Sequence, residues 1–152
     1  MPYSILSILT GLLLLASAGS RPALGLAPQD EFTLEPWPGD WGEVVGIEAV
    51  GDGRFVAWER GGMGWMVGPD GLASVEPLFD ITEEVNSYRD HGLLGLALDP
   101  DFLSNGHVYL LYVVDRHHLD FAETPGYDPE VNDFVAATIG RVTRYIATAE
   151  SR

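Results

Sequence analysis

The feature that most constrains the fold is a series of short, strand-like runs separated by glycine-rich turns. Turn signals occur at Gly51-Asp52-Gly53 and Gly68-Pro69-Asp70-Gly71. Pro77 has no backbone N–H and so places the last run of the series at the edge of a sheet. The series predicts a four-stranded antiparallel unit with strands at Val44–Val50, Arg54–Glu59, Met63–Val67 and Ala73–Ile81.

A second series with the same texture follows. A turn at Asp99–Gly106 and a long polar loop at Asp115–Asp133 interrupt it. The strands predicted on either side of these interruptions are Gly92–Leu98, His107–Val114 and Ala137–Thr148.

The two series align with one another. Gly46-Ile47-Glu48-Ala49 matches Gly95-Leu96-Ala97-Leu98, 49 residues further along the chain. Antiparallel units that repeat at about this period are typical of β-propeller blades. The sequence therefore predicts an all-β fold in which residues 43–82 form one blade and residues 90–152 form an incomplete second blade. The main alternative is a single β-sandwich of about seven short strands.

The run Gly92–Leu98 has the composition expected of the innermost strand of a blade. Gly92, Gly95 and Ala97 would allow close approach around a central channel, and the leucines between them would fill the space between blades. We therefore expect the run to be buried on both faces. Two blades cannot close a ring and would leave apolar faces open, so we expect the chain to be the front end of a longer propeller, about two blades of six.

The amino-terminal segment predicts export. Ile5–Ala16 is an apolar run too short to cross a bilayer comfortably, and Ala16-Ser17-Ala18 offers small residues at cleavage spacing, so residues 1–18 are expected to be a signal peptide. The alternatives are a short uncleaved anchor or a buried helix. Residues 19–42 are expected to be a lead-in linker. The exported protein would be periplasmic or extracellular and free of the membrane after cleavage. It contains no cysteine, so its fold would depend on burial alone.

The charge of the chain argues against one class of partner. There are 23 acidic residues against 8 basic ones, which gives a formal net charge of −15. A chain this acidic repels phosphate backbones, so nucleic-acid binding is not expected.

The segment Asp90–Asp115, "DHGLLGLALDPDFLSNGHVYLLYVVD", resembles the signature of the glucose/sorbosone dehydrogenase family. The segment Gly51–Val67, "GDGRFVAWERGGMGWMV", is similar to the opening hairpin of that family. The resemblance covers roughly Val44 to Ala147, and Gly-Leu-Leu-Gly is its most specific part. Three features depart from the family pattern: Asp99 replaces a common histidine, His91 replaces a small residue, and the loop from His117 to Asp133 has no counterpart.

The resemblance implies a fold and an activity. Members of the family are soluble six-bladed propellers that oxidise the anomeric carbon of an aldose or related sugar and pass a hydride to pyrroloquinoline quinone, with calcium as a second cofactor. By resemblance, Asp90 and the neighbouring His91 would bind the sugar. The catalytic histidine and most cofactor and calcium contacts would lie beyond Arg152. The partners would be the sugar and a periplasmic or extracellular electron acceptor.

Several alternatives stay open. Asp90 could simply cap the turn before its strand. The chain could be a non-catalytic extracellular binding module or an inactive truncated fragment. His117 and His118, with Asp115 and His91, show no spacing typical of a metal site. Asp99, Asp101 and Asn105 lack the ligand pattern of an EF-hand and favour a hydrogen-bonded turn. Trp37, Trp41, Trp58 and Trp65 are expected to pack the blades rather than to stack on sugars.

Overall fold

The computed structural model describes residues 33–151. The predicted signal peptide, residues 1–18, and the linker up to residue 32 lie outside the described residues. The rest of the predicted linker, residues 33–42, has no regular secondary structure. Residues Pro36–Arg152 pack together as one unit.

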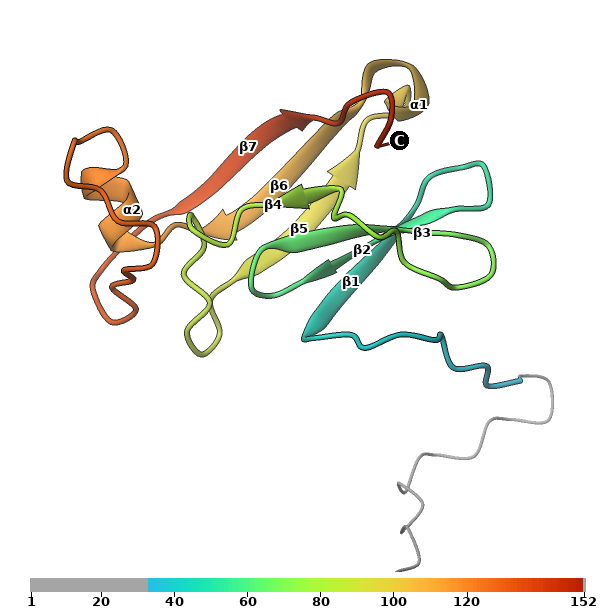
Figure 1. The fold of residues 1–152 in the computed structure, drawn as a ribbon, viewed down its shortest axis with the longest axis horizontal. Coiled ribbons are helices and arrows are strands. Elements are labelled where there is room, and N and C mark those ends of the chain that lie inside the picture. The colour runs from blue at the N-terminus through green and yellow to red at the C-terminus, as the bar shows by residue number, and fades with distance from the viewer. Residues whose placement is uncertain (1–32, 152) are drawn as a thin grey trace, which may run out of the picture. The chain divides into compact units, whose positions relative to one another are not determined.

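That unit contains two antiparallel sheets, in which the strands follow one another in chain order (Figure 1). The first sheet consists of β1 (Val44–Ala49), β2 (Phe55–Glu59), β3 (Met63–Val67) and β4 (Phe79–Asp80). The second consists of β5 (Leu93–Leu98), β6 (His107–Val113) and β7 (Gly140–Ile146). The predicted all-β class is therefore confirmed.

The structure differs from the sequence prediction in three places. The expected strand Ala73–Ile81 is reduced to β4 and an isolated bridge between Val67 and Ala73, because Pro77 between them cannot donate to the ladder. The predicted turn after β5 includes a one-turn helix, α1 (Phe102–Asn105), and the predicted polar loop includes a second helix, α2 (Arg116–Phe121). Across residues 33–151, no helix is long and apolar enough to span a membrane.

The first strands of the two sheets carry the same irregularity. In the first sheet Val44 pairs with Glu59 and Gly46 with Trp58, so Val45 is an extra, bulged residue. In the second sheet Leu93 pairs with Tyr112 and Gly95 with Leu111, so Leu94 is bulged. The bulges lie 49 residues apart, as the aligned glycines do. The repeat is thus present in the backbone as well as in the sequence.

The faces of the two sheets can be named from this repeat, because paired residues point to the same side of a sheet. We call face A the side that carries the aligned glycines. In the first sheet face A holds the row Gly46, Trp58, Gly64 and Phe79; in the second it holds the row Gly95, Leu111 and Val142. Face B is the opposite side, with the rows Ile47, Ala57 and Trp65 in the first sheet and Leu96, Leu110 and Thr143 in the second.

The core lies between face A of the first sheet and face B of the second. Its buried members include Val56, Trp58 and Met66 from the first sheet and Val108, Leu110 and Tyr112 from the second. Strand β5 lies beside β1 and β2. The sheets therefore pack in the same sense, A on B, and each turns its other face outward.

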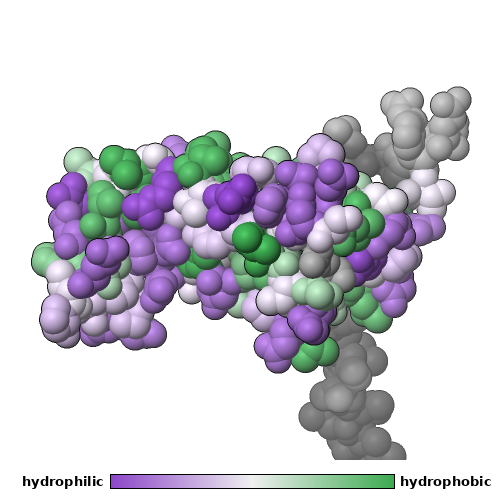
Figure 2. Space-filling view, turned by 90° about the horizontal axis from the view of Figure 1, so that it is seen from above, coloured by the Kyte–Doolittle hydropathy of each residue, from purple (hydrophilic) through white to green (hydrophobic). Residues whose placement is uncertain are grey.

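The outward face of the second sheet corrects one expectation. Strand β5 was expected to be buried on both faces, yet Ala97 is exposed and Leu94 is half exposed. A Cβ built on Gly95 would meet only Leu111, at 3.7 Å, so no close approach requires glycine there. Within the described residues nothing packs over this face of β5. Hydrophobic patches interrupt the hydrophilic surface in the space-filling view (Figure 2).

Candidate functional site

The candidate site is built on the loop between β4 and β5, which Asn86 anchors. Asn86 is fully buried. Its backbone N–H donates to Val113 O (2.9 Å), its Nδ2 donates to Phe134 O (3.2 Å), and its Oδ1 accepts from Tyr88 N (3.1 Å). Asn86 thus joins the start of the loop to the end of β6 through its backbone N–H and to the segment after α2 through its side-chain amide.

Arg60, at the end of β2, holds the middle of the same loop. Its Nη1 donates to Ser87 O at 2.6 Å and to Arg89 O at 2.7 Å. Its Nε donates to Glu43 Oε2 at 2.9 Å, and Nη2 also pairs with that carboxylate. The fixed fork of the guanidinium lets one residue bind two carbonyls and a carboxylate together.

The loop reaches β5 through two unusual backbone conformations. Arg89 is the one non-glycine residue of the described chain with a positive φ, at 55°. Gly92 has φ 141°, and a Cβ at that position would lie 2.5 Å from Arg60 Cγ and 2.7 Å from Arg60 O. The next residue, Leu93, donates its N–H to that same Arg60 carbonyl at 2.8 Å. Glycine at 92 therefore allows the loop to pass directly over the Arg60 backbone.

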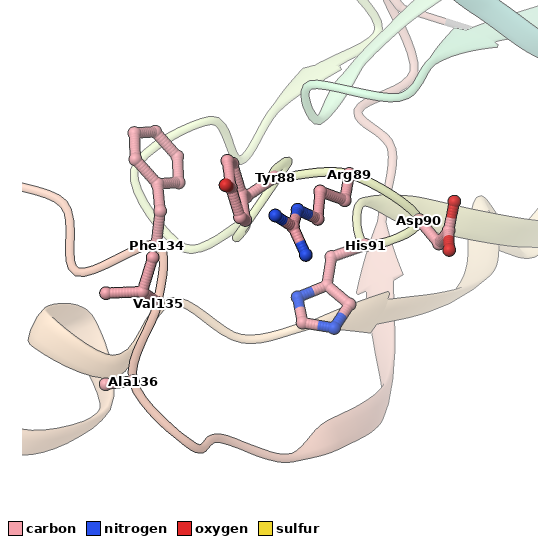
Figure 3. A pocket seen from close by; sticks show the side chains of 7 residues that line it. All are labelled: Tyr88, Arg89, Asp90, His91, Phe134, Val135 and Ala136. Carbon is pink, nitrogen blue, oxygen red and sulfur yellow. The ribbon is translucent and has the colours of Figure 1, made fainter.

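The loop forms one wall of a cleft of about 340 Å³. The residues that line it come from Tyr88–His91 on one side and Phe134–Ala136 on the other. The rings of Tyr88 and Phe134 lie 6.1 Å apart, and the Arg89 Cζ lies 5.1 Å from the Tyr88 ring centroid. Figure 3 shows the Arg89 guanidinium between the Tyr88 ring and the His91 imidazole. Aromatic faces and convergent polar groups are the usual elements of small-molecule sites.

Both residues predicted to bind a sugar, Asp90 and His91, line this cleft. His91 is half-buried, and its Nδ1 is buried without a hydrogen-bond partner among residues 33–151. Asp90 is exposed, and in Figure 3 its carboxylate is turned away from the group formed by Tyr88, Arg89 and His91. The structure places the pair at one site without directing both side chains to one point.

Sequence reasoning missed the residues that anchor the loop, Arg60 and Asn86, and those that surround Asp90 and His91 in the cleft, including Tyr88, Arg89 and Phe134. Arg60 and Arg89 are two of only eight basic residues in a strongly acidic chain, and this scarcity was a usable signal. Phe134 and Val135 follow α2 and reach the cleft only through tertiary packing, so no local pattern indicates them.

The two adjacent histidines belong to a separate structure, the helix α2. Asp115 is fully buried and caps this helix by accepting from His117 N at 2.9 Å and His118 N at 3.4 Å. It also accepts from Asp133 N at 3.1 Å. His117 stacks on Tyr127, and His118 Nδ1 lies 3.0 Å from the Tyr127 hydroxyl. Aromatic packing and helix capping account for this cluster.

Glu84 lies at the centre of a polar network on face B of the second sheet. It accepts from Tyr112 Oη at 2.6 Å and from Tyr145 Oη at 3.2 Å. His118 Nε2 and Arg141 Nη1 lie 3.9 and 3.6 Å from its Oε2. Burial, the Tyr112 hydrogen bond and the negative Glu84 carboxylate raise the pKa of Tyr145, so its hydroxyl stays a donor.

The segment Asp99–Asn105 is a hydrogen-bonded turn. Asp99 Oδ1 accepts from Asp101 N and from Asn105 Nδ2, each at 2.9 Å. These two hydrogen bonds, the backbone one first, lower the pKa of Asp99. One carboxylate oxygen of Asp99 is therefore already engaged by two internal donors.

The tryptophans divide between the interior and an outer face. Trp58 is buried in the core, as its predicted packing role requires. Trp37 and Trp41 line an apolar cleft of about 300 Å³ with Val44, Ile47 and Ala57, on face B of the first sheet.

Comparison with models of known protein families and with curated proteins finds no match to this chain.

Proposed function

We propose that the two sheets are consecutive blades of a β-propeller. Both are antiparallel and follow chain order, and both begin with a bulged strand at the same point of the 49-residue repeat. The A-on-B packing supports this proposal, because blades around an axis stack in one sense and each presents a front to the back of the next.

The same packing disfavours the β-sandwich alternative. A sandwich buries its two apolar inner faces and leaves polar faces outside. Here the outer faces carry exposed aliphatic side chains, including Ile47 on the first sheet and Val142 on the second. Outer faces of this kind suit a stack of sheets better than a closed pair.

In this proposal the chain supplies the sugar-binding rim of an exported quinoprotein dehydrogenase that oxidises the anomeric carbon of an aldose. The observation that carries it is the cleft at the amino-terminal end of β5, where Arg89 and His91 lie beside the Tyr88 ring and Asp90 and Phe134 also line the wall. Carboxylate, imidazole and guanidinium groups can bind sugar hydroxyls, and an aromatic ring can cover an apolar face of a pyranose.

The cofactors of this proposal are assigned to other parts of the protein. Pyrroloquinoline quinone would accept the hydride from the anomeric carbon. Among residues 33–151 no group of three or more His, Cys, Asp or Glu side chains is placed to hold a metal ion. The described residues therefore do not fit a calcium site, and the role of this chain is limited to binding and orienting the sugar. A hydroxyl proton would pass to a base on a later blade.

The second candidate function is a non-catalytic extracellular binding module. The cleft contains the groups needed to hold a saccharide, and no redox group is required for that. The two candidates share the binding step and differ only in turnover.

Calorimetric titration of the purified chain with a panel of aldoses tests the shared step. Asp90→Asn and His91→Gln should weaken binding about tenfold each, the loss expected for one hydrogen bond to a charged or polar group. Asp101→Asn, at the opposite end of β5, is the matched control and should bind as the unmodified chain does. If no aldose binds, both candidates are wrong.

Turnover then separates the candidates. The full protein to which the chain is proposed to belong is assayed with pyrroloquinoline quinone, calcium and a dye acceptor. Oxidation of an aldose supports the dehydrogenase. Binding without turnover across the sugar panel identifies a binding module instead.

A further inference from the structure

The packing of the two sheets leaves one unpaired face of each kind. Face A of the first sheet and face B of the second are buried against each other. The second sheet therefore exposes its face A. The first sheet exposes the part of its face B around Val44 and Ile47, while Ala57 and Val67 on the same face are buried. These are the same two kinds of face that already form the interior of the chain.

The exposed face A is apolar. Leu111, Val142 and Ile146 are 44%, 67% and 63% exposed on it. A shallow cleft of about 260 Å³ runs over the face beside Gly95, Ala97 and Tyr109. In the first sheet the corresponding row, Gly46, Trp58 and Gly64, is in the core. Leu111 and Val142 thus occupy on the surface the positions that Trp58 and Gly64 occupy inside.

The exposed face B offers a matching receptor. Val44 and Ile47 are 40% and 53% exposed there, beside the apolar cleft of about 300 Å³ between Trp37 and Trp41. On the second sheet the corresponding positions are Leu93, which is fully buried, and Leu96, which packs against the core. Within the chain, face B of the second sheet is therefore covered by the apolar face A of the first sheet.

The charges on the two faces do not oppose their contact, although the chain as a whole is strongly acidic. Strands β5, β6 and β7 contain no acidic residue, and Arg144 is exposed on face A. On face B of the first sheet the strands carry Glu59 at the end of β2. A positive group on one face and a negative group on the other favour contact between unlike faces over contact between like faces.

We infer that the chain docks head to tail on a second copy of itself, face A of the second sheet of one copy against face B of the first sheet of the next. The contact continues the interface that already joins the two sheets within each copy. Such a heterologous contact extends from copy to copy and closes into a ring when the rotation permits. This inference concerns the 152-residue chain on its own, because later blades of the proposed dehydrogenase would cover the same two faces. It does not depend on the sugar chemistry.

Sedimentation analysis of the full chain with two single-face variants tests the inference. Val142→Lys places a charge on face A, and Ile47→Lys places one on face B. We expect the unmodified chain to sediment above its single-chain mass at tens of micromolar, and each variant alone to sediment as a single chain, because every contact needs one intact face of each kind. An equimolar mixture of the two variants should form a dimer and nothing larger, since it contains one productive pair of faces.

Val75→Lys is the matched control, because Val75 is 94% exposed and lies outside both faces. It should associate as the unmodified chain does. Circular dichroism checks that each variant is folded, and Leu111→Lys replaces Val142→Lys if the latter is not.

Three results would overturn the inference: a monomeric unmodified chain, self-association of either single variant, or a mixture that stays monomeric. A dimer through two faces A would appear as self-association of Ile47→Lys, and a dimer through two faces B as self-association of Val142→Lys. Sugar binding is measured separately, so either proposal can fail without the other.

Discussion

The indole of Trp58 lies directly over Gly46 on the neighbouring strand, and a Cβ at position 46 would overlap with it. The same arrangement recurs two strands further, where the Phe79 ring lies over Gly64. Glycine and aromatic residues therefore alternate across face A of the first sheet, and each ring fills the space that a missing side chain leaves. The tight core on this side depends on the two glycines.

Gly46→Ala should lower the free energy of unfolding by about 1 to 3 kcal/mol, because the new methyl group forces the Trp58 ring out of its place. Gly95→Ala is the matched control at the aligned position of the second sheet, where the nearest atom would be Leu111 Cβ at 3.7 Å. It should be neutral or stabilising by up to about 1 kcal/mol. Urea unfolding followed by tryptophan fluorescence measures both, and equal effects of the two substitutions would contradict this account of face A.

Arg60→Lys should loosen the loop that carries the candidate site. A lysine ammonium cannot bind the Ser87 and Arg89 carbonyls and the Glu43 carboxylate in one plane, so we expect a loss of about 1 to 3 kcal/mol of stability. Arg54→Lys is the control, because Arg54 pairs only with Asp52 in the exposed hairpin turn, and should cost less than about 1 kcal/mol.

The anchoring role of Arg60 makes a second, local prediction. Amide hydrogen exchange of His91 and Leu93 should speed up in Arg60→Lys and stay unchanged in Arg54→Lys. Unchanged exchange at both amides would show that the loop is held by other contacts.

Asp115→Asn replaces one carboxylate oxygen by an NH₂ group and should strongly lower the free energy of unfolding. The buried carboxylate accepts from three backbone N–H groups, and an amide NH₂ cannot replace both of its oxygens. We expect a loss of about 2 to 3 kcal/mol. Asp128 is exposed and its carboxylate accepts from Glu130 N, so Asp128→Asn should change stability by less than about 1 kcal/mol. Chemical denaturation of both variants provides the comparison.

Tyr145 should make the protein less stable at alkaline pH. Its pKa is raised in the folded state above the usual 10.0, so the folded chain keeps the phenol protonated while the unfolded chain ionises it. The stabilisation is fully present below pH 10 and is lost as pH rises above it. The slope is at most about 1.4 kcal/mol per pH unit and is reduced by solvent screening, since the side chain is only half-buried.

Tyr145→Phe removes this dependence, and the difference between the two unfolding curves from pH 9 to pH 11 isolates it, because the other groups titrate in both proteins. Parallel curves for the two proteins would show that Tyr145 ionises alike in both states.

The sequence patterns that predicted the fold correctly are local ones. Runs of β-forming residues between glycine turns located six of the seven strands of the described chain within a few residues, since strand composition and turn chemistry act over short distances. The exception is β4, which is much shorter than the run Ala73–Ile81 that predicted it. Helix α2 could also have been predicted, because Asp115 is a typical N-cap residue. It was missed because the polar composition of the segment outweighed that single signal.

The parts that could not be predicted depend on which segments meet in space. Asp90 and His91 were identified from a motif. Arg60, which holds their loop, and Phe134, which lines the same cleft, lie about 30 and 40 residues away in the sequence. Close approach was predicted at Gly92 and Gly95. Gly92 does lie against Arg60, whereas a Cβ on Gly95 would meet only Leu111 within the described chain, and the roles of Gly46 and Gly64 beneath aromatic rings were not predicted.

The paired bulges at Val45 and Leu94 have a consequence for how the protein behaves in a crowded solution. Strands β1 and β5 each form one of the two edges of their sheets, where an extended segment from another molecule could add itself to the ladder. The bulged residue in each of these edge strands interrupts the regular spacing of backbone N–H and C=O groups that an incoming strand would have to match. The bulges therefore protect the edges formed by β1 and β5 against the strand addition that begins fibril growth.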